Sequence, residues 1–119
     1  MLPEKERWAT GEAAMIVELR TYTLTAGSVA PYMKVYETEG LGIQRPVLGN
    51  LIGWYSTEFG ALNQVVHLWG YDSFAERERR RAELFKRADW LTFFAKIRPL
   101  IVAQESKILS PAPWSPNTA

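Results

Sequence analysis

The sequence contains no cysteine and one histidine among its 119 residues. The absence of cysteine excludes disulfide bonds, thiolate nucleophiles and zinc or iron–sulfur sites built on thiolates. A metal ion would need mostly carboxylate ligands, and the pattern places no carboxylate cluster on one face. There is also no Gly-rich phosphate loop and no Ser–His–Asp spacing typical of a nucleophilic triad. We therefore expect no metal site and no cofactor.

Strong charge of one sign and long apolar runs are also missing. The formal net charge is +1, which gives no reason to expect nucleic acid or an anionic membrane as a partner. No apolar run approaches the roughly 20 residues of a membrane span. Charges interrupt residues 1–14, which therefore do not resemble a signal peptide. These features, with the lack of cysteine, favour a cytoplasmic protein.

What the chain does contain is enough apolar residues for one domain. Hydrophobic residues make up 47% and aromatic residues 13%, a heavy aromatic load for a small fold. We expect a flexible extension over residues 1–14, a domain over residues 15–110 and a Pro-rich tail over residues 111–119. Met1 and Met15 both stay open as the native start.

The hydrophobic pattern predicts strands and helices in the order β-α-β-β-α-β. The expected strands are Met15–Leu24, Leu51–Phe59, Gln64–Tyr71 and Leu100–Leu109. One helix should start after Ser28 and end at Gly40, with residues 42–50 as a connection. A second should start in the capping box Ser73–Glu76 and run to about Arg87, and a further helical piece should start at Asp89 and stop at Pro99. This order is that of an α+β, ferredoxin-like protomer with an antiparallel sheet.

Alternation along the two central strands separates two faces of the sheet. Val17, Leu19, Val66 and Leu68 form an apolar face, which we expect beneath the helices. The opposite face is mixed, with aromatic and charged side chains: Glu18, Arg20, Tyr22, Val65, His67 and Trp69. Because such a face needs a cover, we expect a second copy of the sheet to pack on it, giving a homodimer that encloses a cavity.

The candidate site follows from that mixed face. His67, in the stretch "LNQVVHLW", could be a general base, while a buried histidine with a structural hydrogen bond is the plainer interpretation. Arg20 could hold a carboxylate or an enolate oxygen, or pair with Glu18 or Glu105. Tyr22, Trp54, Tyr55 and Trp69 could line an aromatic pocket or simply pack in a core. Strand parity with Ile101 and Ala103 suggests that Glu105 rather than Gln104 faces the cavity, although a bulge would reverse this.

The run "ERERRRAELFKR" is the densest in charge. Its glutamates alternate with arginines at helical spacing, which predicts a solvated helix with i, i+3 and i, i+4 ion pairs rather than a nucleic-acid-binding surface.

Three stretches together resemble the NIPSNAP family: "MIVELRTYTL", "GALNQVVHLWGYDSFAERERRR" and "IRPLIVAQESKIL". The resemblance covers Met15 to about Pro113. It implies a ferredoxin-like protomer that pairs into a dimeric α+β barrel, but it supplies no catalytic residues. Relatives in the wider barrel superfamily include cofactor-independent monooxygenases and haem enzymes, which are analogies at the level of the fold.

These observations leave several functional hypotheses open. The first is a protein that binds a small apolar or aromatic molecule in the barrel, with a cofactor-independent monooxygenase or isomerase as its enzymatic form. In that form His67 takes a proton, Arg20 steadies an oxyanion, and Tyr22 with Trp69 holds the ring. The alternative is a non-enzymatic adaptor or interaction module. A lower alternative is a haem-binding protein with His67 as axial ligand.

Overall fold

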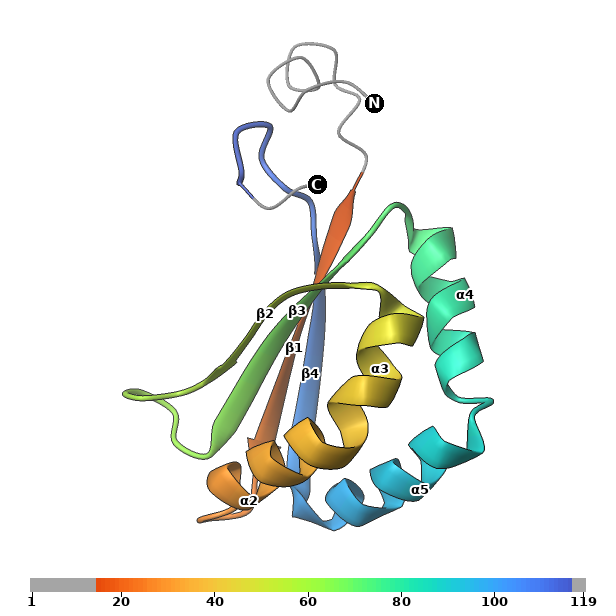
Figure 1. Ribbon diagram of the computed structural model, residues 1–119. Helices are drawn as coiled ribbons and strands as arrows, with labels where there is room; N and C mark the ends of the chain where they lie inside the picture. The colour runs from red at the N-terminus through yellow and green to blue at the C-terminus, as the bar shows by residue number, and fades with distance from the viewer. Residues whose placement is uncertain (1–14, 117–119) are drawn as a thin grey trace.

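A computed structural model describes residues 15–116 as one antiparallel sheet with helices packed on one face (Figure 1). The strands are β1 (Ile16–Leu24), β2 (Asn50–Ser56), β3 (Gln64–Tyr71) and β4 (Ile101–Leu109). The sheet order is β2-β3-β1-β4, so β1 and β3 are central and β2 and β4 form the edges. All three pairings are antiparallel, which confirms the ferredoxin-like α+β protomer.

The first helical region is longer than the sequence predicts. α2 (Val29–Val35), the π-helical turn η1 (Tyr36–Gly40) and α3 (Leu41–Leu48) follow one another without a break. The prediction that Gly40 ends the helix is wrong, because the chain stays helical through Pro46 and turns only at Gly49, where φ is 95°. Gly40 instead permits a close approach: a Cβ atom there would lie 2.5 Å from the ring of Phe93.

The second helical region follows the prediction more closely. α4 (Phe74–Leu84) begins at Ser73, whose hydroxyl accepts a hydrogen bond from the backbone N–H of Glu76. α5 (Ala88–Ile97) leads through η2 (Arg98–Leu100), a short 3-10 turn that contains Pro99, into β4. Arg87, not Asp89, takes the cap position of α5, and the Asp89 carboxylate accepts from the N–H of Trp90.

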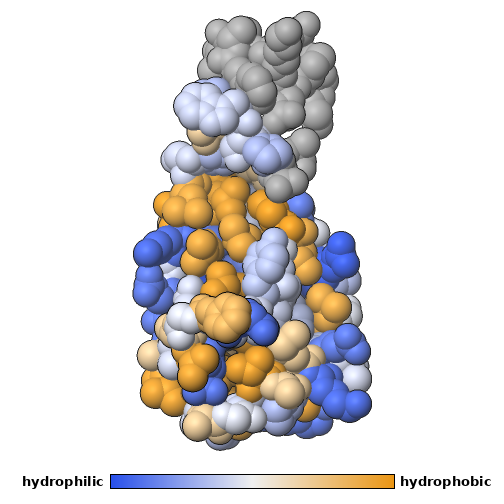
Figure 2. Space-filling view, turned by 90° about the vertical axis from the view of Figure 1, so that its left-hand side faces the viewer, coloured by the Kyte–Doolittle hydropathy of each residue, from blue (hydrophilic) through white to orange (hydrophobic). Residues whose placement is uncertain are grey.

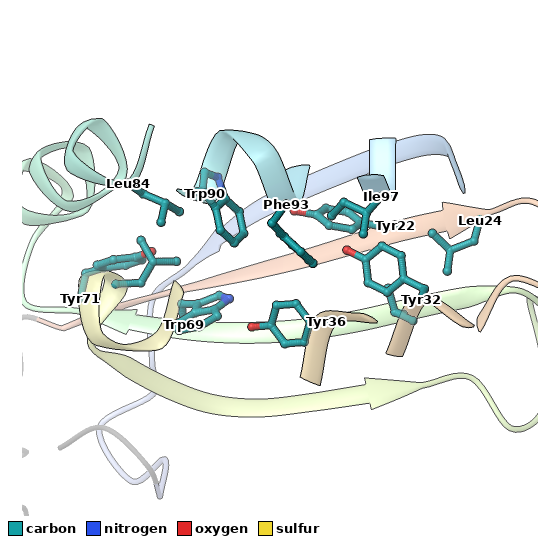
Figure 3. Close-up of a cluster of buried hydrophobic side chains, with 12 residues drawn as sticks. Tyr22, Leu24, Tyr32, Tyr36, Trp69, Tyr71, Leu84, Trp90, Phe93 and Ile97 are labelled. Carbon is teal, nitrogen blue, oxygen red and sulfur yellow. The ribbon is translucent and has the colours of Figure 1, made fainter. Parts of the chain in front are cut away.

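The helices cover the opposite face of the sheet from the one predicted. The core brings Tyr22 of β1 and Trp69 of β3 against Leu84 and Phe93 of the helices (Figure 3). Val65 of β3 belongs to the same core. His67 is 2% exposed and Glu18 is completely buried, so both lie beneath the protomer's own helices. The space between sheet and helices must be filled by side chains, and the aromatic rings of this face fill more of it than the smaller aliphatic side chains of the other face would.

The aliphatic face is therefore the open face of the sheet. It carries Val17, Leu19, Val66 and Leu68, and a hollow of about 440 Å³ lies on it between Val17 and the segment Ser110–Pro116. Figure 2 shows the side of the molecule away from the helices, where apolar side chains gather below this segment. The extension predicted over residues 1–14 lies outside the described residues, as do residues 117–119. No helix in residues 15–116 is long and apolar enough to cross a membrane.

Candidate functional site

The candidate site lies between the sheet and the helices, and His67 is at its centre. Nδ1 of His67 accepts a hydrogen bond of 2.6 Å from the indole N–H of Trp69, two residues along β3. An indole nitrogen can only donate, so Nδ1 is unprotonated and the neutral ring carries its proton on Nε2. Burial, with the nearby charge of Arg20, lowers the pKa of His67 to about 3. His67 thus presents an N–H donor to the interior at neutral pH.

Aromatic rings surround this imidazole on both strands beside it. Tyr22 of β1 meets the His67 ring edge-on at 5.0 Å between centroids. Trp54 of β2, the register partner of His67, stacks on it at 5.5 Å. Tyr36 stacks in turn on Trp54 at 5.1 Å, and its hydroxyl donates to the buried side chain of Gln44 at 2.6 Å. Tyr36 of the π-helical turn and Gln44 of α3 thus cover the strand residues from the helix side.

Glu18 is the buried anion of the site. Its carboxylate accepts two hydrogen bonds from Arg77 of α4, at 3.0 and 2.9 Å, one from Arg20 at 2.8 Å and one from Ser106 at 2.5 Å. Burial alone would raise the pKa of Glu18, but the hydrogen bonds from Arg77 and Ser106 and the charge of Arg20 lower it to about 2. Arg20 also donates to the Tyr22 hydroxyl at 3.0 Å. The carboxylate thus fixes Arg20 against the aromatic cluster.

Two small cavities adjoin these groups. One, of about 10 Å³, is lined by the aromatic cluster with His67, and the other, of about 90 Å³, by Arg20 and Arg81. They share four wall residues: Tyr22, Gln44, Trp90 and Phe94. A more open hollow of about 190 Å³ lies beyond Tyr36 and Trp54, beside Met33 and Leu51. The interior is therefore a chain of small spaces with mostly aromatic walls.

Unpaired hydrogen-bond donors gather at the smallest of these spaces. In the described chain, four buried side-chain polar atoms form no hydrogen bond of good geometry, and three of them belong to its walls: Nε1 of Trp54, Nε2 of His67 and Nε1 of Trp90. The Trp54 N–H lies near enough to the Tyr36 hydroxyl to lower its pKa, so among the described wall residues His67 and Trp90 carry the two fully unpaired donors. All three carry N–H groups, so none can satisfy another. Since buried polar groups are nearly always paired, this clustering indicates a place for an acceptor atom.

The structure brings together all but one of the residues that the sequence predicts for the site. Glu18, Arg20, Tyr22, Trp54 and His67 lie together, and Trp69 orients His67 from within the core. Glu105 is the exception. It pairs in register with Thr21 and forms an ion pair with Lys107, so it lies on the open face, whereas Gln104 and Ser106 lie on the helix side. The parity assignment for Glu105 is wrong because Ile101 and Leu24 pair across an irregular register at the start of β4.

Sequence reasoning also missed the contributions of the helices. The expected surface ion pairs are present, Glu76 with Arg79 and Arg80, but Arg77 and Arg81 turn inward. These two residues precede the buried Leu84 at spacings of seven and three, so the helical period could have indicated their face. Gln44 and Trp90 gave no comparable signal.

The size of the His67 cavity also bears on metal and haem binding. Within residues 15–116, no group of three or more His, Cys, Asp or Glu side chains could hold a metal ion. A haem on Nε2 of His67 does not fit, because that atom borders a cavity of only about 10 Å³.

Comparison with known proteins then identifies the family. The NIPSNAP family model matches residues 17–116, nearly the whole described chain. The chain belongs to the NIPSNAP family. A NipSnap homolog of Dictyostelium discoideum is 35% identical over 94 residues, covering 79% of this chain and 41% of the relative. Human NipSnap homolog 3A is 34% identical, with 82% of this chain and 39% of the relative covered. The chain thus spans about two fifths of the length of these curated NIPSNAP relatives.

Solved structures give the same family and fold. An uncharacterized NIPSNAP-like domain protein from Burkholderia xenovorans is 48% identical, with a TM-score of 0.86 over 87% of this chain and 90% of that one. SnoaB, a cofactor-independent oxygenase from Streptomyces nogalater, has a TM-score of 0.56 at 11% identity, over 82% of this chain and 93% of its own. That second likeness concerns the fold alone.

Proposed function

We propose that this NIPSNAP protein binds a small apolar or aromatic molecule that carries a carbonyl or enolate oxygen, between sheet and helices. The cavity of about 10 Å³ at His67 holds the oxygen, and the ring occupies an adjoining space of about 90 or 190 Å³. The observation that carries the proposal is the group of N–H donors around one cavity, of which those of His67 and Trp90 have no partner within residues 15–116. Donors without acceptors favour a ligand oxygen, and aromatic walls favour an apolar or aromatic remainder.

The same arrangement supports binding of the enolate form of such a ligand. Fixed N–H donors stabilise negative charge that develops on an oxygen, and they do so most strongly where water is excluded. In this proposal His67 donates from Nε2 rather than removing a proton, because its Nδ1 is engaged by Trp69. Arg20 adds positive charge beside Tyr22. SnoaB adds only that a protein of similar fold is a cofactor-independent oxygenase.

A second copy of the chain completes the proposed assembly. The open face of the sheet bears the half-buried aliphatic residues Leu19, Val66 and Leu68, which a second sheet would cover. The pairing surface is therefore the aliphatic face, and the ligand site lies on the other side of each sheet. A cytoplasmic location stays a prediction.

The experiment measures binding of acetophenone, which has a ring and an enolisable carbonyl, against ethylbenzene, which lacks the oxygen. Quenching of tryptophan fluorescence and thermal stabilisation report binding, since Trp54 and Trp90 are in the wall. We expect acetophenone to bind more tightly. Trp90→Phe, which removes one N–H and keeps an aromatic ring, should reduce this preference by about tenfold.

Trp114→Phe is the matched control, because Trp114 is 70% exposed and lies outside the site. It should leave the preference for acetophenone unchanged. If neither compound binds, or if Trp90→Phe and the native protein discriminate equally, the proposal fails and the adaptor hypothesis is favoured.

A further inference from the structure

We propose that the ligand is an organic acid, whose carboxylate binds between Arg20 and Arg81 in the cavity next to the N–H donors. This inference rests on the proposed function and adds the chemical class of the ligand. It gives the ligand two fixed points: a carbonyl oxygen at the donors of His67 and Trp90, and a carboxylate at the two guanidinium groups.

The protein's own buried carboxylate, Glu18, is fully used. Oε1 of Glu18 accepts one hydrogen bond from Arg77, and Oε2 accepts one each from Arg77, Arg20 and Ser106. A carboxylate offers about four lone-pair sites, so these bonds leave Glu18 little capacity for a further donor. Arg20 and Arg77 thus already neutralise the buried negative charge.

Arg81, by contrast, has no anion as a partner in the described chain. Its side chain is half-buried, and its guanidinium carbon lies 5.6 Å from the centre of the Phe85 ring. Among residues 15–116 no hydrogen bond or ion pair is formed by its five N–H groups. Burial and the charge of Arg20 lower the pKa of Arg81, and the charge of Glu18 does not offset them. An unpaired cation in this position would be stabilised by an anion.

The cavity beside Arg81 has the size and the walls to hold a carboxylate. The cavity of about 90 Å³ is several times larger than one water requires, and Arg20 and Arg81 both line it. Trp90 and Phe94 form apolar walls that continue into the donor cavity. A guanidinium group binds a planar carboxylate through two parallel hydrogen bonds, and the apolar walls suit the carbon skeleton. Gln44 borders both cavities and can position the atoms between the two ends.

The test compares benzoylformate with its primary amide, benzoylformamide. The two probes share the ring and the ketone and differ in the charge of one group. Isothermal titration calorimetry on the full chain should give at least about tenfold tighter binding of the acid, as expected for a charge-assisted pair. Arg81→Gln should reduce this preference to about twofold or less, and Arg81→Lys, which keeps the charge, should retain part of it.

Arg79→Gln is the matched control on the same helix, since Arg79 is 55% exposed and pairs with Glu76 outside the cavity. It should keep the full preference for the acid. Equal binding of acid and amide, or an unchanged preference in Arg81→Gln, would overturn the carboxylate site while acetophenone binding still upholds the proposed function. If the native protein does not bind acetophenone, the proposed function itself is overturned instead.

Discussion

Replacing Glu18 by glutamine tests the charge network on which the site depends. The substitution keeps the shape of the side chain but removes the anion of Arg20 and leaves Arg77 with Glu78 alone. A carboxyl pKa of about 2 in the folded protein, against an ordinary value of 4.5, corresponds to about 3 kcal/mol of stability at neutral pH. Breaking a buried ion pair by removing one partner costs about 3 to 5 kcal/mol, in agreement. We expect Glu18→Gln to lower the free energy of unfolding by at least about 3 kcal/mol at pH 7.

Urea unfolding at one protein concentration, repeated from pH 7 down to pH 2, measures this effect. Because the folded pKa of Glu18 is depressed, its contribution is complete above the unfolded pKa of 4.5 and is lost as the pH falls toward 2. The native protein should therefore lose stability over that range more steeply than Glu18→Gln, and the two curves should converge in acid. At pH 7 the melting temperature of the variant should be roughly 10 °C lower.

Glu83→Gln provides the control, because Glu83 is 61% exposed and its nearest cation, Arg79, is 3.8 Å away. Exposed pairs of this kind contribute little, so the unfolding midpoint should stay almost unchanged. The reasoning is refuted if Glu18→Gln is within about 1 kcal/mol of the native protein at pH 7 and the two lose stability in parallel on acidification.

Three further predictions concern the core, the histidine and the open face. Gly40→Ala should lower the free energy of unfolding by about 1 to 3 kcal/mol in thermal unfolding, because its Cβ would collide with Phe93. Gly42→Ala is the control and should be neutral or slightly stabilising, since no atom lies within 4 Å of a Cβ there; equal effects of the two would contradict this packing. The single histidine, His67, should show no NMR titration between pH 5 and 8, since its pKa is about 3. Its contribution to stability should be present above pH 6.5 and lost as the pH falls toward 3. A titration midpoint near 6.5 would show that the ring is not buried in solution. Sedimentation should give about twice the protomer mass of 13.6 kDa, and Leu68→Lys on the open face should shift the protein toward monomer; a monomeric native protein would remove the proposed pairing.

Much of the fold follows from local patterns. Alternation over Ile16–Leu24 and Gln64–Tyr71 predicts the central strands, and the Ser73 cap predicts the start of α4, because both depend on neighbours a few residues away. The connection expected over residues 42–50 was wrong for a related reason. Pro46 and the glycines favour a loop locally, but packing of Gly40 against Phe93 and of Leu48 in the core holds this segment helical.

The sequence by itself determined that Glu18, Arg20, Tyr22 and His67 share one side of the two central strands, because side chains in a strand alternate between faces. Only the tertiary structure decided that this side lies under the helices. Its charges looked unsuited to a core, but their partners, Arg77 and Ser106, come from α4 and β4, 59 and 88 residues along the chain from Glu18. The buried face is decided by partners far along the chain that neutralise its charges, and by the volume that its aromatic rings fill. The spacing of residues along a single strand contains neither quantity.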